Sequence, residues 1–263
     1  DLSSLTTFAD SLMKTADLKQ YRITGTINAN MSIIGIPINA NIPMDFRLKL
    51  NADNTVQSAY INLDVPYFIG VLQQDMTAKV YYEDGVLYFD RNWETSTGAL
   101  WWKEYYDHHE YMKCTIDEFM ANPMKYVYFC TNFTSMVENA INDAIAKSDQ
   151  KAVRTGNIMF EEALTGFNYN GSNQWNVNLD AAHLINNSDF SDQMSITVGK
   201  GSNGILNSIS LSTRVLDMIN LQLNNGQLVN ADKSNVDMSV VPTGLSSNPN
   251  YVFGEVTVVE TKK

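Results

Sequence analysis

The chain has few cationic residues, few cysteines and no long apolar run. Lysine and arginine together number 18, against 29 aspartate and glutamate residues, and the formal net charge is −11. A protein that contacts nucleic-acid phosphates needs clustered lysine and arginine, so we expect no nucleic-acid partner. The acidic surface also disfavours electrostatic docking to anionic lipid and favours a monomer.

No apolar stretch approaches the ~18–20 residues that a membrane-spanning helix needs. The sequence starts at Asp1 without an initiating Met, and we hypothesise that an export signal has been removed. Cys114 and Cys130 are too far apart for a CxxC motif, and no further cysteines could complete a structural zinc site. In an exported protein this pair could form a disulfide, and two buried thiols are the alternative.

The most regular pattern lies between Tyr21 and Leu50, where apolar and polar side chains alternate. Such alternation places the two sets on opposite faces of a strand, so we predict two long strands joined by a turn at Gly35. Both strands are much longer than the usual ~5–6 residues. A long sheet with one apolar face is expected to curve and to be covered by another layer. The apolar face comprises Tyr21, Ile23, Ile27, Ala29, Met31, Ile33, Ile38, Ala40, Ile42, Met44, Phe46, Leu48 and Leu50.

Helical periodicity, with apolar residues three and four positions apart, marks residues 3–16 and an insert at 115–149. Thr115 to Glu118 matches a capping box, and Asn122-Pro123 can start a second helix, so the insert is expected to hold two helices. The other predicted elements are strands at 55–65, 76–82, 86–91, 175–179, 194–198, 205–215, 219–223 and 252–259, a hairpin turn at 83–85, a turn at 224–226, a short helix at 180–185 and irregular chain at 231–250.

The order of these elements indicates an α+β fold of many antiparallel strands, with the helices gathered on one side. No composition shift or linker divides the sequence, so we predict a single domain over residues 1–263. Twelve methionines lie mostly on the apolar faces, where core packing is the preferred interpretation and an adaptable binding surface the alternative.

Two segments resemble the LolA/LolB and LppX/LprG-like lipoprotein carriers. The first is Tyr81–Asp90 (YYEDGVLYFD) followed by Ala99–Lys103 (ALWWK), which is similar to LolA-like lipoproteins of Gram-positive bacteria. The second is Trp175–Ile185. The resemblance implies a single LolA-like domain, in which an incomplete β-barrel wraps around the N-terminal helix and the two-helix insert. It also implies an apolar cavity and a lipid or lipidated ligand.

From this resemblance we expect a non-enzymatic envelope lipoprotein. It would be exported and held on the membrane by a lipid on a cysteine upstream of Asp1. A groove between sheet and helices would bind a hydrophobic or acyl-bearing ligand, because each sheltered CH₂ contributes about 0.8 kcal/mol. A cell-surface interaction or sensor module with a filled interior is the alternative. The candidate ligand-binding residues are Ile27, Met31, Ile42, Met44, Phe46, Leu48, Ile61, Leu63, Met76, Val80, Met124, Val127, Tyr128 and Val137.

His108, His109 and Glu110 form the most conspicuous polar cluster. Adjacent histidines on a helix diverge, unlike the i, i+4 pair of a zincin, and a metal site would need Asp107 or His183 as well. A polar connector is the simpler interpretation. No Gly-x-Ser-x-Gly elbow or Gly-rich phosphate loop occurs, so a hydrolase that uses either histidine is a minor hypothesis. We therefore predict no catalytic residue, metal or cofactor.

An aromatic cluster precedes the helical insert. Tryptophan and tyrosine tolerate a half-wet setting, so the cluster could rim a cavity mouth or pack onto the end of the sheet. Packing is the preferred interpretation for most of it. The cluster comprises Trp93, Trp101, Trp102, Tyr105, Tyr106 and Tyr111.

Overall fold

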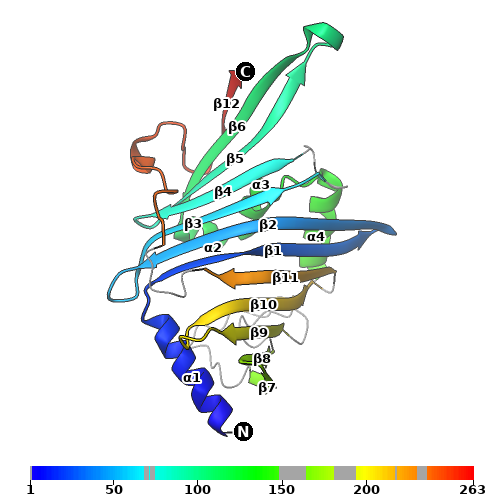
Figure 1. Ribbon diagram of the computed structural model, residues 1–263. Coiled ribbons are helices and arrows are strands. Elements are labelled where there is room, and N and C mark those ends of the chain that lie inside the picture. Colours follow the sequence, from blue (N-terminus) through cyan, green and yellow to red (C-terminus); the bar gives the residue numbers. More distant parts are fainter. Residues whose placement is uncertain are drawn as a thin grey trace.

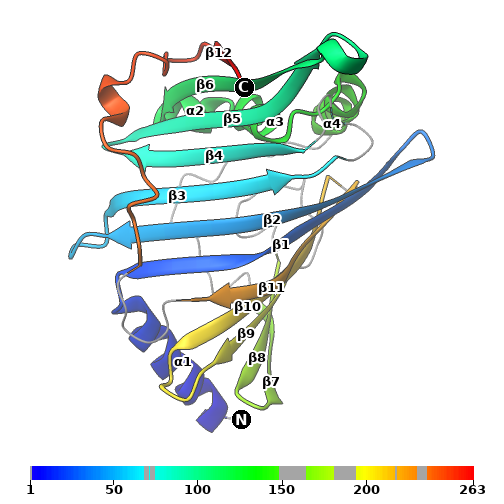
Figure 2. The same ribbon diagram turned by 45° about the horizontal axis from the view of Figure 1, so that its top comes forward.

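The computed structural model describes residues 2–67, 71, 75–147, 164–180, 194–216, 218–229 and 236–263. Twelve strands of this part form one antiparallel sheet in the order β12-β6-β5-β4-β3-β2-β1-β11-β10-β9-β8-β7. Figures 1 and 2 show that the sheet is curved and open, with β12 and β7 at its two edges. The strands are β1 Gln20–Ile33, β2 Ile36–Leu50, β3 Val56–Val65, β4 Met76–Glu83, β5 Val86–Thr97, β6 Glu104–Thr115, β7 Leu164–Gly171, β8 Gln174–Leu179, β9 Met194–Lys200, β10 Leu206–Val215, β11 Ile219–Leu228 and β12 Thr257–Lys262.

The structure combines this antiparallel sheet with the helices α1–α4, which confirms the α+β class. The helices occupy two separate places along the sheet. The helix α1 (Leu2–Ala16) contacts β10, whereas α3 (Pro123–Thr131) contacts β4 and β5. The insert also contains α2 (Ile116–Ala121) and α4 (Ser135–Lys147), so the predicted two-helix insert is wrong. Asn132 explains the difference, because its left-handed backbone and its N–H bond to the Tyr128 carbonyl end α3.

The long hairpin predicted from the alternating pattern is confirmed. β1 and β2 pair along their whole length, from Gln20 opposite Lys49 to Ile33 opposite Ile36. Their apolar side chains near the β1–β2 turn contribute to the largest core cluster, which also contains residues of α3 and α4. Its buried members are Met31, Ile33, Ile38, Ala40, Ile42, Val65, Met76, Ala78, Phe89, Trp93, Met112, Cys114, Tyr126, Phe129, Cys130, Val137 and Ile141.

Two predictions about the strands are wrong. Residues 108–110, interpreted as a polar connector, lie within β6, which pairs with both β5 and β12. The turn predicted at Asn224 to Gly226 is a bulge within β11, where Asn225 has a φ of 53° and the pairing with both neighbours shifts. A Cβ on Gly226 would lie 2.1 Å from the Ile209 carbonyl oxygen, so glycine is required by close packing of the backbones.

The C-terminal segment, residues 236–256, covers part of the outer face of the sheet. The described part of the predicted irregular region, 236–250, consists of turns and one short 3₁₀ helix, Leu245–Ser247. Leu245 and Tyr251 pack on Tyr60, Tyr81 and Tyr88 of β3, β4 and β5. The outer face is therefore apolar over β3, β4 and β5, and the C-terminal segment covers this part of it. The last strand begins and ends later than the predicted range 252–259, since β12 spans Thr257–Lys262.

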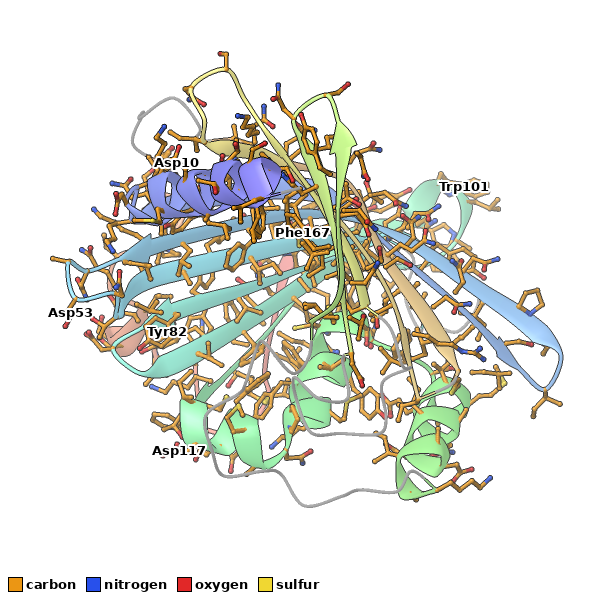
Figure 3. The ribbon with its side chains drawn as sticks, turned by 90° about the horizontal axis from the view of Figure 1, so that it is seen from below. Asp10, Asp53, Tyr82, Trp101, Asp117 and Phe167 are labelled. Atoms are coloured by element: carbon orange, nitrogen blue, oxygen red, sulfur yellow. The ribbon has the colours of Figure 1, made fainter. Side chains whose placement is uncertain are left out.

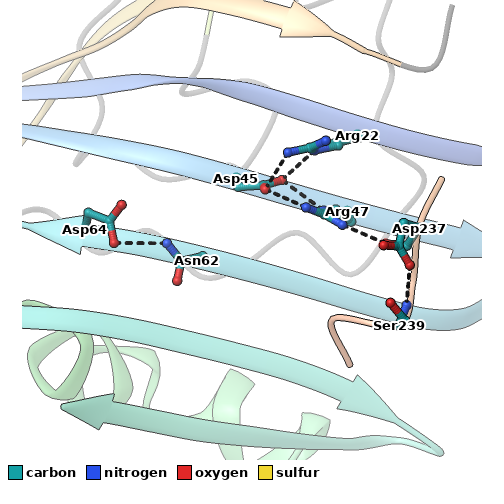
Figure 4. A network of polar contacts seen from close by, with 7 residues as sticks. All are labelled: Arg22, Asp45, Arg47, Asn62, Asp64, Asp237 and Ser239. Carbon is teal, nitrogen blue, oxygen red and sulfur yellow. Dashed lines mark hydrogen bonds and ion pairs between the residues drawn. The ribbon is translucent and has the colours of Figure 1, made fainter. Parts of the chain in front are cut away.

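An ion-pair network joins this segment to β1 and β2 (Figure 4). The Asp45 carboxylate accepts hydrogen bonds from Arg22 at 3.0 Å and from Arg47 at 2.9 Å, and Arg47 also donates to the Asp237 carbonyl at 2.7 Å. Burial disfavours the Asp45 carboxylate, but the hydrogen bonds and charges of Arg47 and Arg22 outweigh burial, so the pKa of Asp45 lies below its usual value.

We expect Asp45→Asn to lower the free energy of unfolding by about 1–3 kcal/mol at pH 7, because Arg47 loses its carboxylate partner. The folded pKa of Asp45 is depressed, so its contribution is present above the unfolded pKa and is lost as the pH falls through the folded pKa. Urea unfolding should therefore show a difference between wild type and variant that narrows below about pH 4. A difference that stays constant with pH would contradict this assignment.

Candidate functional site

An apolar cavity of about 250 Å³ lies where the end of α1 meets the sheet. Five neighbouring strands, β2, β1, β11, β10 and β9, supply most of its wall. Each long strand contributes residues from its apolar face, which the curvature of the sheet brings together. The lining residues are Thr15, Tyr21, Ile23, Phe46, Leu48, Val198, Leu206, Ser208, Ile209 and Leu228.

The polar groups of Thr15 and Tyr21 are already hydrogen-bonded within the protein. The Tyr21 hydroxyl donates to the carbonyls of Thr15 and Ala16 at the C-terminal end of α1. The Thr15 hydroxyl donates to the Ser11 carbonyl at 2.6 Å and accepts from the Leu206 N–H at 3.0 Å. These two side chains therefore offer mainly carbon atoms to the cavity, which suits an apolar ligand.

Trp175 anchors α1 over this region. Its indole N–H donates to the Ser4 carbonyl at 3.1 Å, and its side chain is 1% exposed. Phe8 of α1 packs between Trp175 and Phe167, with ring-centroid distances of 5.4 and 5.2 Å. Figure 3 shows α1 on this side of the sheet, close to Phe167. The cluster around Trp175 also includes Leu206 and Ile209, so the α1 anchor and the cavity wall are continuous.

Two of the predicted ligand-binding residues, Phe46 and Leu48, line this cavity. Most of the others belong to the core beneath the α2–α4 insert, while Met44 and Ile61 are half-buried and Val127 is 38% exposed. The core members are Met31, Ile42, Met76 and Val137, which are buried, and Ile27, Leu63, Val80, Met124 and Tyr128, which pack against them.

The sequence interpretation missed the part of the wall that comes from later strands. Each of these residues lies in a predicted strand or beside one: Val198, Leu206, Ile209 and Leu228. No local pattern, however, shows that the later strands lie next to β1 in the sheet. The pairing of β1 with β11 brings the later strands next to β1, and it places Ile23 directly opposite Leu228. The wall is thus assembled by contacts between residues far apart in the sequence.

Cys114 and Cys130 are separate buried thiols in the structure, which corresponds to the second of the two alternatives and not to a disulfide. Burial raises the pKa of Cys130 to about 12, although the nearby charge of Arg91 acts in the opposite direction. Burial also raises the pKa of Cys114, with a smaller opposing effect of its hydrogen bond to Tyr126.

Neither thiol should react with iodoacetamide in the native protein at pH 8. The thiolate is the reactive species, and a pKa near 12 leaves roughly one part in 10⁴ of Cys130 ionised. Both should be labelled in guanidinium without a reductant, which mass spectrometry would detect. Labelling that requires prior reduction would instead show a disulfide.

The two adjacent histidines point to opposite faces of β6. His108 stacks on Trp93 and contacts Glu260 at 2.8 Å, whereas His109 contacts Asp90 and stacks on Tyr111. Among the described residues, no group of three or more His, Cys, Asp or Glu side chains could hold a metal ion. The polar side-chain contacts described for the two histidines are all with carboxylates: Glu260 and Glu110 for His108, and Asp90 for His109. His183 lies outside the described residues, as does the predicted short helix at 180–185 apart from Asp180.

The aromatic cluster divides into packed and exposed members. Trp93 is 8% exposed and belongs to the core, as expected. Trp101 and Trp102, at the turn between β5 and β6, are 88% and 63% exposed, so the packing interpretation is wrong for them. They lie on neither the cavity lining nor a described core cluster.

Neither a comparison with models of known protein families nor one with curated proteins finds a match. None of the helices that the structure describes is long and apolar enough to cross a membrane.

Proposed function

We propose that this protein is a non-enzymatic binding protein that shelters an acyl-bearing or other hydrophobic ligand in the cavity beside α1. The observation that carries the proposal is the cavity's lining, which is apolar apart from Thr15, Tyr21 and Ser208. Burial of each CH₂ there would contribute about 0.8 kcal/mol. The volume of about 250 Å³ is just below the ~300–1,000 Å³ of drug-sized sites. It suits a short acyl chain or one end of a longer chain.

The proposed ligand site differs in place from the groove expected from the sequence. Val137 and Ile141 of α4 are 0% and 2% exposed and belong to the core cluster between the insert and the sheet. This filled region favours the alternative of an interaction or sensor module. The cavity beside α1 favours the carrier. The curved sheet, as an incomplete β-barrel around its helices, would then serve the carrier as in LolA-like proteins. An exported, lipid-anchored protein on the cell envelope remains part of the same proposal.

Extraction of the purified protein with organic solvent, followed by mass spectrometry, would test for a bound lipid. A delipidated sample should then bind a fluorescent fatty acid that an unlabelled fatty acid displaces in a one-to-one ratio. Absence of extractable lipid together with no saturable fatty-acid binding would refute the carrier and leave the interaction module.

A further inference from the structure

Two hairpins project apolar residues at the same end of the sheet. Consecutive strands of the β1–β6 meander alternate in direction, so the β1–β2 and β5–β6 turns lie at the same end. Both hairpins extend past their neighbours in Figure 1, and Figure 3 shows Trp101 and the β1–β2 turn toward the same side. We refer to residues 34–36 and 98–102 as the two tips.

The tips expose some of the largest apolar side chains of the molecule. Ile34 is 91% exposed at the first tip. At the second tip Leu100, Trp101 and Trp102 are 78%, 88% and 63% exposed. Single exposed apolar residues are ordinary, but consecutive Leu-Trp-Trp at the apex of a projecting hairpin marks an interaction site.

Backbone strain at the tips supports a role beyond folding. Ile34 and Leu100 have φ values of 51° and 55°, in the left-handed region that disfavours bulky and β-branched residues. The β4–β5 turn, by contrast, has Asp84 and Gly85 at φ values of 50° and 79°. Asp-Gly and Asn-Gly are the residues that such a turn favours. The β4–β5 turn thus has the preferred residues. The β1–β2 turn instead has an exposed isoleucine, Ile34, at the position that corresponds to Asp84.

The tips are also free of charge in a strongly acidic protein. No Asp, Glu, Lys or Arg occurs in residues 23–44 or 95–102, although the whole chain carries 29 acidic residues. Charged residues begin directly below the second tip, where Lys103 is followed by Glu104, which pairs with Lys262 at 2.6 Å. Each tip therefore has an uncharged apex, and the second stands above a charged base.

We propose that the two tips dock the protein on a lipid bilayer by entering its interface. Tryptophan and aliphatic side chains favour this environment, and an uncharged apex crosses the headgroup layer without desolvating a carboxylate. A stable protein interface buries about 800 Å² per partner in a continuous patch, whereas these tips are separate convex points. With a single lysine beside them, the tips suit zwitterionic lipid and do not require anionic lipid. The tips lie outside the cavity, so this inference is independent of the proposed function.

Flotation with phosphatidylcholine vesicles tests the proposal. Wild type should float with the vesicles, and its tryptophan fluorescence should shift to shorter wavelength. Ile34→Asn combined with Leu100→Asn should reduce binding at least about tenfold, because two apolar side chains leave the bilayer. The same variant should keep or raise Tm, because asparagine tolerates the left-handed backbone at both positions. A lost binding signal therefore could not be attributed to unfolding.

Matched variants distinguish docking by the tips from adsorption through any exposed apolar residue and from self-association. Trp101→Ser with Trp102→Ser should also abolish flotation, whereas Met120→Gln, which changes a 70% exposed residue on α2, should not affect it. Wild type that stays unbound, or tip variants that float like wild type, would overturn the proposal. A third outcome would also overturn it: wild type self-associates in sedimentation, the tip variants do not, and no protein floats. The tips would then contact a second copy of the chain.

Discussion

Trp175→Ala should lower the free energy of unfolding by about 3–5 kcal/mol, the range for truncating a large buried aromatic residue. Trp175 is 1% exposed and packs against Phe8 and Tyr169. The substitution also removes the hydrogen bond to the Ser4 carbonyl, which ties α1 to the sheet. Chemical denaturation monitored by circular dichroism would measure the loss.

Trp101→Ala provides the matched control. Trp101 is 88% exposed, so the same substitution there should change stability by less than about 0.5 kcal/mol. Trp175→Ala should also expose α1 to trypsin at Lys14 under conditions in which the rest of the fold persists. Equal effects of the two substitutions, or an α1 that stays protected, would show that Trp175 does not anchor the helix.

Leu48→Trp should weaken fatty-acid binding by roughly tenfold or more, because the larger side chain takes up space in a cavity of about 250 Å³. Ile61→Trp is the control. Ile61 is another half-buried residue of the predicted apolar wall, on the neighbouring strand β3, but it does not line the cavity. Displacement of a fluorescent fatty acid would give both affinities.

The control variant should bind like wild type, and both variants should remain folded by circular dichroism. Equal loss of binding in the two variants would place the ligand elsewhere on the wall. Unchanged binding in Leu48→Trp would exclude the cavity beside α1 as the site.

The parts of the fold that the sequence predicts well are those governed by local chemistry. Strict alternation defines β1 and β2, Asp84-Gly85 defines the β4–β5 turn, and Thr115 with Glu118 forms the predicted capping box. In each case neighbouring residues contain the whole signal: side-chain period, backbone preference or side-chain hydrogen bonding.

The errors arise where distant residues decide the outcome. β6 is polar on both faces near its start, and its residues Glu104 and His108 find partners in Lys262 and Glu260 of β12. The interpretation of 108–110 as a connector omits that edge strand. The bulge at Gly226 likewise depends on the Ile209 carbonyl of the next strand.

The candidate site shows the same division. The apolar face that contains Phe46 and Leu48 follows from alternation, but its separation into a filled core and a cavity does not. That separation depends on where the helices pack: the α2–α4 insert fills one part of the wall, and α1 only borders the other. Helix placement on a sheet is set by side-chain packing between distant segments, and no local pattern encodes it.

Isothermal titration with straight-chain fatty acids of increasing length would test the cavity as the ligand site. Each added CH₂ should strengthen binding about fourfold, the equivalent of 0.8 kcal/mol, until the cavity is full. The heat capacity change should be negative, and Leu48→Trp should shorten the longest chain that still gains affinity. Affinity that does not depend on chain length, or no binding at any length, would contradict the assignment of this cavity as an acyl-chain site.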